Sequence, residues 1–231
     1  MTTRKLPIGV QDFASIREDG YLYIDKTAHI EKLLSSGKPY FLARPRRFGK
    51  SLFLSTLKYY FMGRKDLFQG LTVDKYEKDW IEYPMFYIDL NTSGYYNDVD
   101  ELKSILNTMI GRFEDQWGTD EREETIPDRF KGVISRACEK SGKKVVVLID
   151  EYDKPLISTM DDPLVYEKVR NFLKGFYGVL KAADLHIRFA MLTGVTKFSK
   201  VSVFSDLNQL NEIGMDRQYS EICGISEKEL L

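Results

Sequence analysis

The chain has 231 residues, of which 43 % are apolar and 30 % charged, and a formal net charge of −1. These values are typical of one soluble α/β domain with a sizeable core, and they exclude an overall field that would draw the chain to nucleic acid or to an anionic membrane. The longest aliphatic run, Val145 to Ile149, is too short to span a bilayer. The first residues lack the apolar stretch of a signal peptide, so we expect a cytoplasmic protein without a membrane partner.

Helices and strands alternate in the first half of the sequence. The patterns predict a helix over Thr27 to Ser36 ended by Gly37, a strand at Tyr40 to Ala43, a helix over Lys50 to Met62 and a strand at Pro84 to Leu90. Asp98 and Glu101 then form a capping box, which opens an amphipathic helix that reaches Phe113. Residues 114–128 are acidic and polar, and we expect them to form an exposed loop.

The second half continues the alternation. A helix marked by Phe130 and ended by Gly142 is followed by the strand "KVVVLID", a helix from about Pro163 to Ala183, and the strand "HIRFAMLTG". Strands that are apolar along their whole length predict a parallel sheet covered on both faces. Ligands of such sheets bind beyond the carboxyl ends of the strands.

The chain ends inside a predicted helix. Ser226 and Glu229 form a second capping box, and Leu230 and Leu231 begin an apolar face. A helix of barely one turn is not stable in water. We therefore expect residues 1–231 to be one domain of a natural chain that continues beyond Leu231.

A candidate phosphate-binding loop lies in "ARPRRFGKSLFL", residues 43–54. Gly49-Lys50-Ser51 ends the pattern G-x-x-x-x-G-K-[ST], between an apolar strand and an amphipathic helix. Backbone amides at that helix N-terminus would point at an anion, Lys50 would reach the β- and γ-phosphates, and the Ser51 hydroxyl would ligate Mg²⁺. The predicted nucleotide-binding segment comprises Arg46, Arg47, Phe48, Gly49, Lys50, Ser51 and Leu52.

Arg44 stands where this pattern has its first glycine. The residue before a proline favours extended conformations, and Pro45 follows. Arg44 is therefore predicted to prolong the strand, and residues 46–49 to make the turn, so that the loop keeps its length.

A second half of the site is predicted in "KKVVVLIDEYDKP". Asp150 at the strand tip would hold Mg²⁺ through water, and Glu151 would orient and deprotonate the attacking water. Thr193 ends another strand, where it would either act as a sensor of the γ-phosphate or simply end the strand. Asp89 would either support the metal indirectly or cap the loop at Asn91, and we favour the cap.

Long segments resemble the signature blocks of the bacterial AAA-ATPase-like family. These segments are "LPIGVQDFASIREDGYLYIDKT", "RPRRFGKSL", "VVVLIDEYDKPL", "LTGVTKFSKVSVFSDLNQL" and "YSEICGISEKEL". The resemblance covers essentially the whole chain, and the family's own form of the loop also has arginine in place of the first glycine.

This resemblance implies an additional-strand P-loop NTPase fold of the AAA/STAND-like type, with a central parallel sheet flanked by helices. "PMFYIDL" is then the extra strand between the loop and the Walker B strand. Gly49, Lys50 and Ser51 are carried over as the Walker A residues, and Asp150 and Glu151 as the Walker B carboxylates. The family also implies a following PD-(D/E)XK nuclease-like domain that this chain lacks, with DNA as that domain's target.

Some roles stay open at this stage. Arg46 and Arg47, together with Arg44, fit three roles: an arginine finger, pairing with Asp153 or Glu151, or contact with a nucleic-acid backbone. Lys197 and Lys200 follow the last strand, where we favour solvated side chains over a γ-phosphate contact. Homo-oligomerisation is left open as well.

We therefore predict an enzyme, a Mg²⁺-dependent ATPase domain that binds ATP or ADP and drives or regulates the C-terminal effector. Two alternatives belong to other classes. One is a nucleotide-binding switch with negligible turnover. The other is a nucleic-acid-binding module that uses the basic "RPRR" loop, against which the near-zero net charge argues.

Overall fold

A parallel β-sheet between two helical layers organises the protein in a computed structural model, which describes residues 5–35, 39–91, 98–196 and 210–230. In this part of the chain the strands are β1 (Tyr40–Ala43), β2 (Met85–Asp89), β3 (Val145–Asp150), β4 (Ile187–Gly194) and β5 (Asn211–Glu212). Their order is β2-β3-β4-β1-β5, and every neighbouring pair is parallel. The predicted parallel sheet is thereby confirmed, and Gly37, the predicted end of the first helix, lies outside the described residues.

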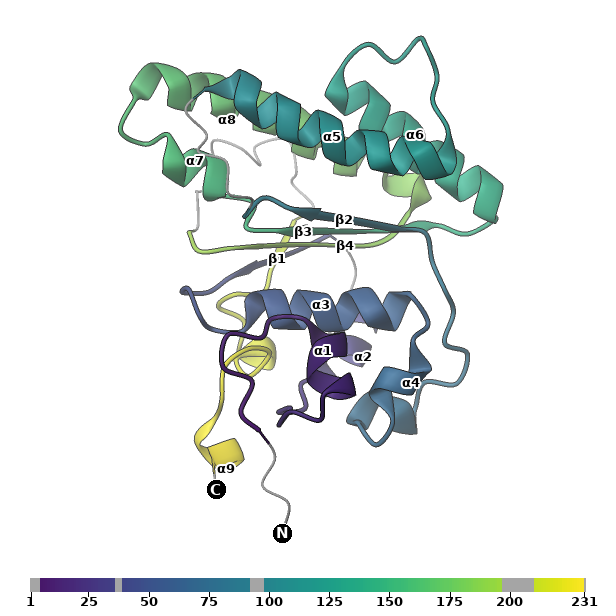
Figure 1. Ribbon diagram of the computed structural model, residues 1–231, viewed down its shortest axis with the longest axis vertical. Coiled ribbons are helices and arrows are strands. Elements are labelled where there is room, and N and C mark those ends of the chain that lie inside the picture. Colours follow the sequence, from purple (N-terminus) through teal and green to yellow (C-terminus); the bar gives the residue numbers. More distant parts are fainter. Residues whose placement is uncertain (1–4, 36–38, 92–97, 197–209, 231) are drawn as a thin grey trace.

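Helices cover both faces of this sheet (Figure 1). One layer contains α5 (Val99–Trp117), α6 (Ile126–Ser141), α7 (Lys154–Ser158) and α8 (Pro163–Ala182). The other contains α1 (Phe13–Glu18), α2 (Ala28–Ser35), α3 (Lys50–Phe61) and α4 (Lys65–Phe68), with the short α9 (Glu227–Leu230) near the chain ends. Short 3₁₀ turns lie at Thr72–Lys75, Asp184–His186 and Arg217–Tyr219. Within the described ranges, no helix is both long and apolar enough to cross a bilayer.

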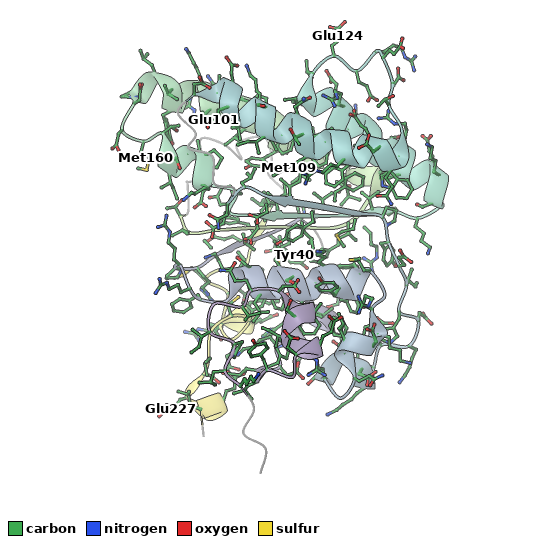
Figure 2. The ribbon with its side chains drawn as sticks, in the orientation of Figure 1. Tyr40, Glu101, Met109, Glu124, Met160 and Glu227 are labelled. Carbon is green, nitrogen blue, oxygen red and sulfur yellow. The ribbon has the colours of Figure 1, made fainter. Side chains whose placement is uncertain are left out.

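Each face of the sheet has its own hydrophobic core. Figure 2 shows side chains filling both spaces, with Met109 on the side of α5 and Tyr40 on the side of α3. On the α5 side the rings of Phe130 and Phe176 stack at 5.1 Å. On the α3 side Tyr40 packs on Phe189, and its hydroxyl donates to the Leu33 carbonyl at 2.7 Å. Because β3 is buried at all of its positions, both cores meet on this strand.

The strand "PMFYIDL" is not the inserted strand that we predicted. It forms β2 at an edge of the sheet, and β4 lies between β1 and β3. The burial of the two strands gives the physical reason, because alternate residues of β2 are only half-buried, whereas all but one residue of β4 are buried. A central strand needs apolar side chains on both faces, and β4 meets this requirement better.

The acidic loop is shorter than predicted. α5 continues to Trp117 and α6 begins at Ile126, so that Glu114 belongs to a helix and is 7 % exposed. Its carboxylate accepts from Arg129 of α6, with Arg129 Nε 2.9 Å from Glu114 Oε1. The sequence pattern predicted that this carboxylate is exposed to solvent, but an arginine of the next helix is its hydrogen-bond partner.

Candidate functional site

The predicted phosphate loop joins β1 to α3 at the carboxyl edge of the sheet. The Arg44 amide donates to the Gly194 carbonyl at 3.2 Å, so Arg44 extends the pairing of β1 with β4 as predicted. The turn follows at residues 46–49, where Arg47 and Gly49 have positive φ angles of 63° and 86°. Glycine adopts such angles without steric cost. The loop therefore closes directly onto the first turn of α3.

Lys50 is folded back over this loop. Its ammonium donates to the Pro45 carbonyl at 3.1 Å, and the residue is only 3 % exposed. Ser51 follows in the same helical turn and is half-buried. An ammonium and several amides thus converge on the N-terminus of a helix, an arrangement suited to binding an anion.

The partners of Arg44 are backbone carbonyls, which are none of the three roles that the sequence left open for this arginine. Its guanidinium donates to the carbonyls of Gly214 and Tyr219, the latter at 3.4 Å. These carbonyls belong to the segment that follows β5. Arg44 therefore ties the C-terminal part of the chain to the base of the loop, and one of the three arginines is engaged away from the phosphate side.

Asp150 and Thr193 meet at the ends of adjacent strands. Asp150 is 3 % exposed and Thr193 fully buried. The Thr193 hydroxyl donates to Asp150 Oδ1, and the Glu151 amide donates to the same oxygen at 3.0 Å. These bonds fix the carboxylate at the tip of β3. The sensor role of Thr193 stays a prediction, and the structure adds that Thr193 orients Asp150.

Glu151 lies just past the tip of β3 in a left-handed conformation, with φ of 53°. Such an angle costs of order 1–3 kcal/mol for a residue other than glycine and often marks a functional position. Burial raises the pKa of this half-buried carboxyl, as do the charges of Asp150 and Asp153, while Lys50 and Arg46 oppose the rise. The loop and the β3 tip are therefore close enough to interact electrostatically.

Tyr152 and Asp153, which sequence reasoning gave no role of their own, hold the turn after β4. Asp153 is fully buried, and its Oδ2 accepts from the amides of Val195 and Thr196 at 2.9 and 2.6 Å and from the Thr196 hydroxyl at 2.7 Å. The Tyr152 hydroxyl donates to the Thr196 carbonyl at 2.8 Å. Asp153 thus accepts hydrogen bonds from the backbone that follows β4. Pairing of Asp153 with Arg46 or Arg47 was one of the alternatives that the sequence left open.

Gly194 explains why this turn can pack so closely. A Cβ atom at this position would lie 2.3 Å from Cε1 of Tyr152 and 2.7 Å from Oδ1 of Asp153. The pair "TG" at the end of a strand and the second aspartate in "DEYDKP" are the sequence signals for this contact.

Asp89 has the capping role that we favoured. Its Oδ1 accepts from the Asn91 amide at 2.8 Å. In the sheet Asp89 pairs with Asp150. Burial raises the pKa of the Asp89 carboxyl, and the charge of Asp150 adds to the rise. Lys197 and Lys200 lie outside the described residues.

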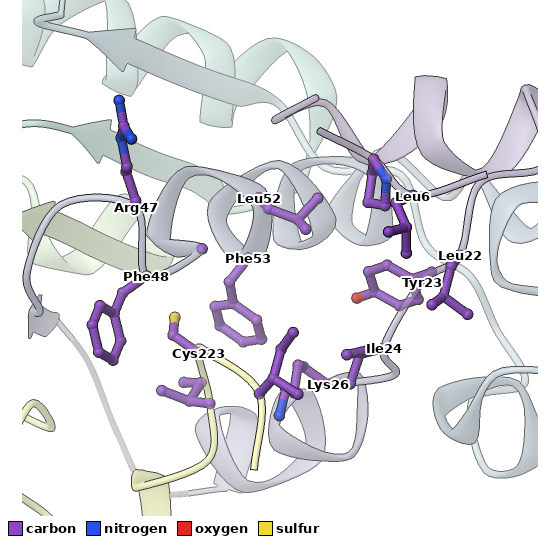
Figure 3. A pocket seen from close by; sticks show the side chains of 15 residues that line it. Leu6, Leu22, Tyr23, Ile24, Lys26, Arg47, Phe48, Leu52, Phe53 and Cys223 are labelled. Atoms are coloured by element: carbon purple, nitrogen blue, oxygen red, sulfur yellow. The ribbon is translucent and has the colours of Figure 1, made fainter. Parts of the chain in front are cut away.

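A cavity of about 320 Å³ adjoins the phosphate loop on the side away from the sheet (Figure 3). Four segments line it: Leu6 with Pro7, residues around Leu22 and Tyr23, the loop at Phe48 with Leu52 of α3, and residues 222–225. Most of this lining is apolar. Four residues of the predicted nucleotide-binding segment, Arg47, Phe48, Gly49 and Leu52, therefore line this cavity.

Lys26, one of the residues that line the cavity, forms an ion pair. The Lys26 ammonium lies 2.7 Å from Glu229 Oε1 of α9, and the Ser226 amide donates to Oε2 of the same carboxylate at 2.7 Å. The half of the predicted capping box in which the Glu229 carboxylate accepts from the Ser226 amide is thereby confirmed. Burial alone would raise the pKa of the Glu229 carboxyl, but the hydrogen bonds from Lys26 and Ser226 outweigh it and lower the pKa to about 2.

Glu229→Gln should make the stability of the protein less sensitive to acid. Because the folded pKa is depressed, the carboxylate stabilises the fold above its unfolded pKa, and this contribution is lost as the pH falls through the folded value. The partly exposed pair limits the effect to about 1 kcal/mol or less. Urea unfolding from pH 6 down to pH 2 should show the wild-type advantage disappearing below about pH 4.5. Glu227→Gln, on the same helix, should leave the profile unchanged, and a constant difference at every pH would contradict this assignment.

Comparison with known proteins assigns a family to this arrangement. A family model described as predicted AAA-ATPase matches residues 7–204. The chain belongs to the AAA-ATPase-like family. This membership agrees with the five-stranded parallel sheet and its flanking helices, which have the architecture of a P-loop NTPase. It also supports ATP binding and ATPase activity at the level of the family.

One relative of this AAA-ATPase-like chain is a protein of Azotobacter chroococcum mcd 1 described as "Uncharacterized protein in vnfD 5'region". The two are 43 % identical over 233 residues, and the alignment covers 100 % of this chain and 45 % of the relative. The chain therefore spans less than half the length of the relative that it matches. No solved structure is significantly similar to it.

Proposed function

We propose that this domain binds Mg²⁺·ATP at the carboxyl edge of its sheet and hydrolyses the γ-phosphate. The observation that carries the proposal is the juxtaposition of Gly49 and Lys50, at the first turn of α3, with Asp150 and Glu151 at the tip of β3. Parallel sheets bind their ligands at this edge. A helix N-terminus faces the phosphates, while carboxylates face the metal and the water.

The residues present fit a magnesium site in which the phosphates of the substrate supply some of the metal ligands. Mg²⁺ is commonly held by one or two carboxylates together with substrate phosphates and water. Asp150 offers a buried, oriented carboxylate and Ser51 a half-buried hydroxyl at the helix start. Among the described residues no group of three or more acids, histidines or cysteines could form an all-protein cage. Bound there, Mg²⁺ would neutralise phosphate charge and align the β- and γ-phosphates.

Each protein group has one task in this mechanism. The loop amides and Lys50 bind the phosphates, and Lys50 exchanges the Pro45 carbonyl for a phosphate oxygen. Glu151 orients the attacking water and accepts its proton. Thr193 holds Asp150 in place. One of Arg46 and Arg47 stabilises the charge of the transition state.

Lys50→Ala should weaken the binding of Mg²⁺·ATP by about 10- to 100-fold, because a charged hydrogen bond contributes about 1.5–3 kcal/mol. Isothermal titration calorimetry of wild type and variant measures this loss. Lys181→Ala, an exposed lysine on α8, serves as the control and should bind as the wild type does. Equal affinity of Lys50→Ala and the wild type would disprove the phosphate-loop assignment.

The relative's greater length leaves room for a further domain. We propose that nucleotide binding here drives or regulates such an effector, which the family resemblance suggests is nuclease-like and directed at DNA. The same Lys50→Ala substitution, made in a chain that carries the effector, should then abolish the ATP dependence of DNA cleavage. Cleavage that is equally ATP-dependent in the variant would contradict the coupling.

A further inference from the structure

The apolar cavity beside the phosphate loop has no task in the chemistry described above. Its lining leaves apolar side chains partly open to solvent, with Phe48 45 %, Leu22 38 % and Ile225 57 % exposed. A cavity of about 320 Å³ falls at the lower end of the range that takes small organic molecules. An uncharged, flat group would cover these side chains and gain the free energy of their burial.

Charge at the cavity also favours an uncharged occupant. The Lys26 ammonium is already paired with Glu229. Burial raises the pKa of the Cys223 thiol to about 12, so this thiol stays neutral at physiological pH. Figure 3 shows the Arg47 guanidinium pointing away from the apolar side chains that line the cavity. Anions are thus favoured on the side of Arg47 and the α3 N-terminus, and an aromatic ring on the other side.

A ligand with both properties is a nucleoside polyphosphate. Its anionic end matches the loop at Gly49, and its base and ribose match the adjoining apolar space. A bare phosphate would leave the cavity unfilled, and a purely apolar ligand would leave the loop amides and Lys50 without a counterpart. The continuity of the two features through Phe48 and Gly49 favours one ligand that spans both.

One wall of the cavity depends on Arg44. The wall consists of residues 222–225, and it lies close to the loop: a Cβ atom on Gly224 would contact the Phe48 ring at 3.5 Å. Upstream of this wall, the Arg44 guanidinium holds the carbonyls of Gly214 and Tyr219. The backbone at Gly214 is so close to β1 that a Cβ atom there would lie 2.9 Å from the Ala43 carbonyl oxygen.

We propose that this cavity receives the base and ribose of the nucleotide, and that Arg44 is a positioning residue that holds the cavity wall. The proposal rests on the proposed nucleotide-binding function. It also gives a physical reason for arginine at the place where the motif has glycine. Arg44 contributes to nucleotide binding through the segment that it anchors and does not touch the phosphates.

Arg44→Gly, which restores the motif's glycine, tests this proposal. In this variant the carbonyls of Gly214 and Tyr219 lose their charged donor, so the cavity wall is no longer held in place. We therefore expect the Kd of Mg²⁺·ATP to rise by about tenfold or more. The Kd of Mg²⁺ with inorganic triphosphate, which lacks a base, should change by less than about twofold. Calorimetry with both ligands measures these values. Unchanged or tighter ATP binding by Arg44→Gly would overturn the proposal, as would an equal loss for both ligands, which would mean that Arg44 supports the loop itself.

A second pair of variants tests the cavity directly and perturbs the fold little. Ile225→Ser removes an exposed apolar side chain from the cavity, and Leu185→Ser removes an exposed side chain, 81 % accessible, from a distant turn. Ile225→Ser should weaken ATP about fivefold and leave triphosphate unchanged, and Leu185→Ser should change neither. Wild-type protein that binds triphosphate as tightly as ATP, with no effect of Ile225→Ser, would refute the base site and leave the phosphate site standing. Wild-type protein that binds neither ligand would refute both.

Discussion

Glu151→Gln is expected to lower the rate of ATP hydrolysis by about 10²- to 10⁴-fold, the range typical for removing a general base. Glutamine has the size of glutamate and can still orient a water molecule, but it cannot accept the proton. Mg²⁺·ATP binding should stay the same or become tighter, because a negative charge near the phosphates is removed. Steady-state phosphate release together with calorimetry separates these two effects.

Glu121→Gln is a matched control, since Glu121 is exposed in the turn between α5 and α6. It should keep the wild-type rate and affinity. If Glu151→Gln hydrolysed ATP as fast as Glu121→Gln, Glu151 would not be the base. Negligible turnover in the wild type, with intact binding in both variants, would instead favour a nucleotide-dependent switch.

Asp153→Ala is expected to destabilise the protein by about 3 kcal/mol, because the fully buried Asp153 accepts three hydrogen bonds and each contributes about 1 kcal/mol. Three donors from the half-buried residues Val195 and Thr196 lose their acceptor. Asp153→Asn keeps one oxygen as an acceptor and should lose less. Urea unfolding should show lower midpoints with unchanged slopes.

Asp161→Ala provides the comparison, because Asp161 is an exposed aspartate in the turn before α8. Its free energy of unfolding should match that of the wild type to within about 0.5 kcal/mol. Similar midpoints for Asp153→Ala and Asp161→Ala would mean that the hydrogen bonds to the turn after β4 add little to stability.

The sequence was sufficient for features that depend on local pattern. The apolar runs predicted the four long strands and the parallel sheet, and Pro45 predicted the extended Arg44 and the turn after it. Asp150 and Glu151 could be placed at a strand tip because a buried strand must end where charged residues begin. Thr193 could be brought near them because parallel strands end at one edge of the sheet.

Features that depend on distant partners could not be predicted in this way. The order of β2 and β4 in the sheet is set by which strand buries more of its side chains, and the sequence shows both as apolar. Arg44 reaches carbonyls at Gly214 and Tyr219, and a carbonyl acceptor leaves no mark on side-chain identity. Glu114 looked like a loop residue because its partner, Arg129, belongs to the next helix.

The Lys26–Glu229 ion pair has a consequence for synthesis of the chain, since it joins residues that are 203 positions apart. During translation the N-terminal lining of the cavity leaves the ribosome long before residues 222–229 do. Sheet pairing among β1, β3 and β4 can begin once Gly194 has emerged, whereas the cavity is completed only after residue 229. Because residues 222–229 are synthesised last, the sheet of the nascent domain can form before its cavity is complete.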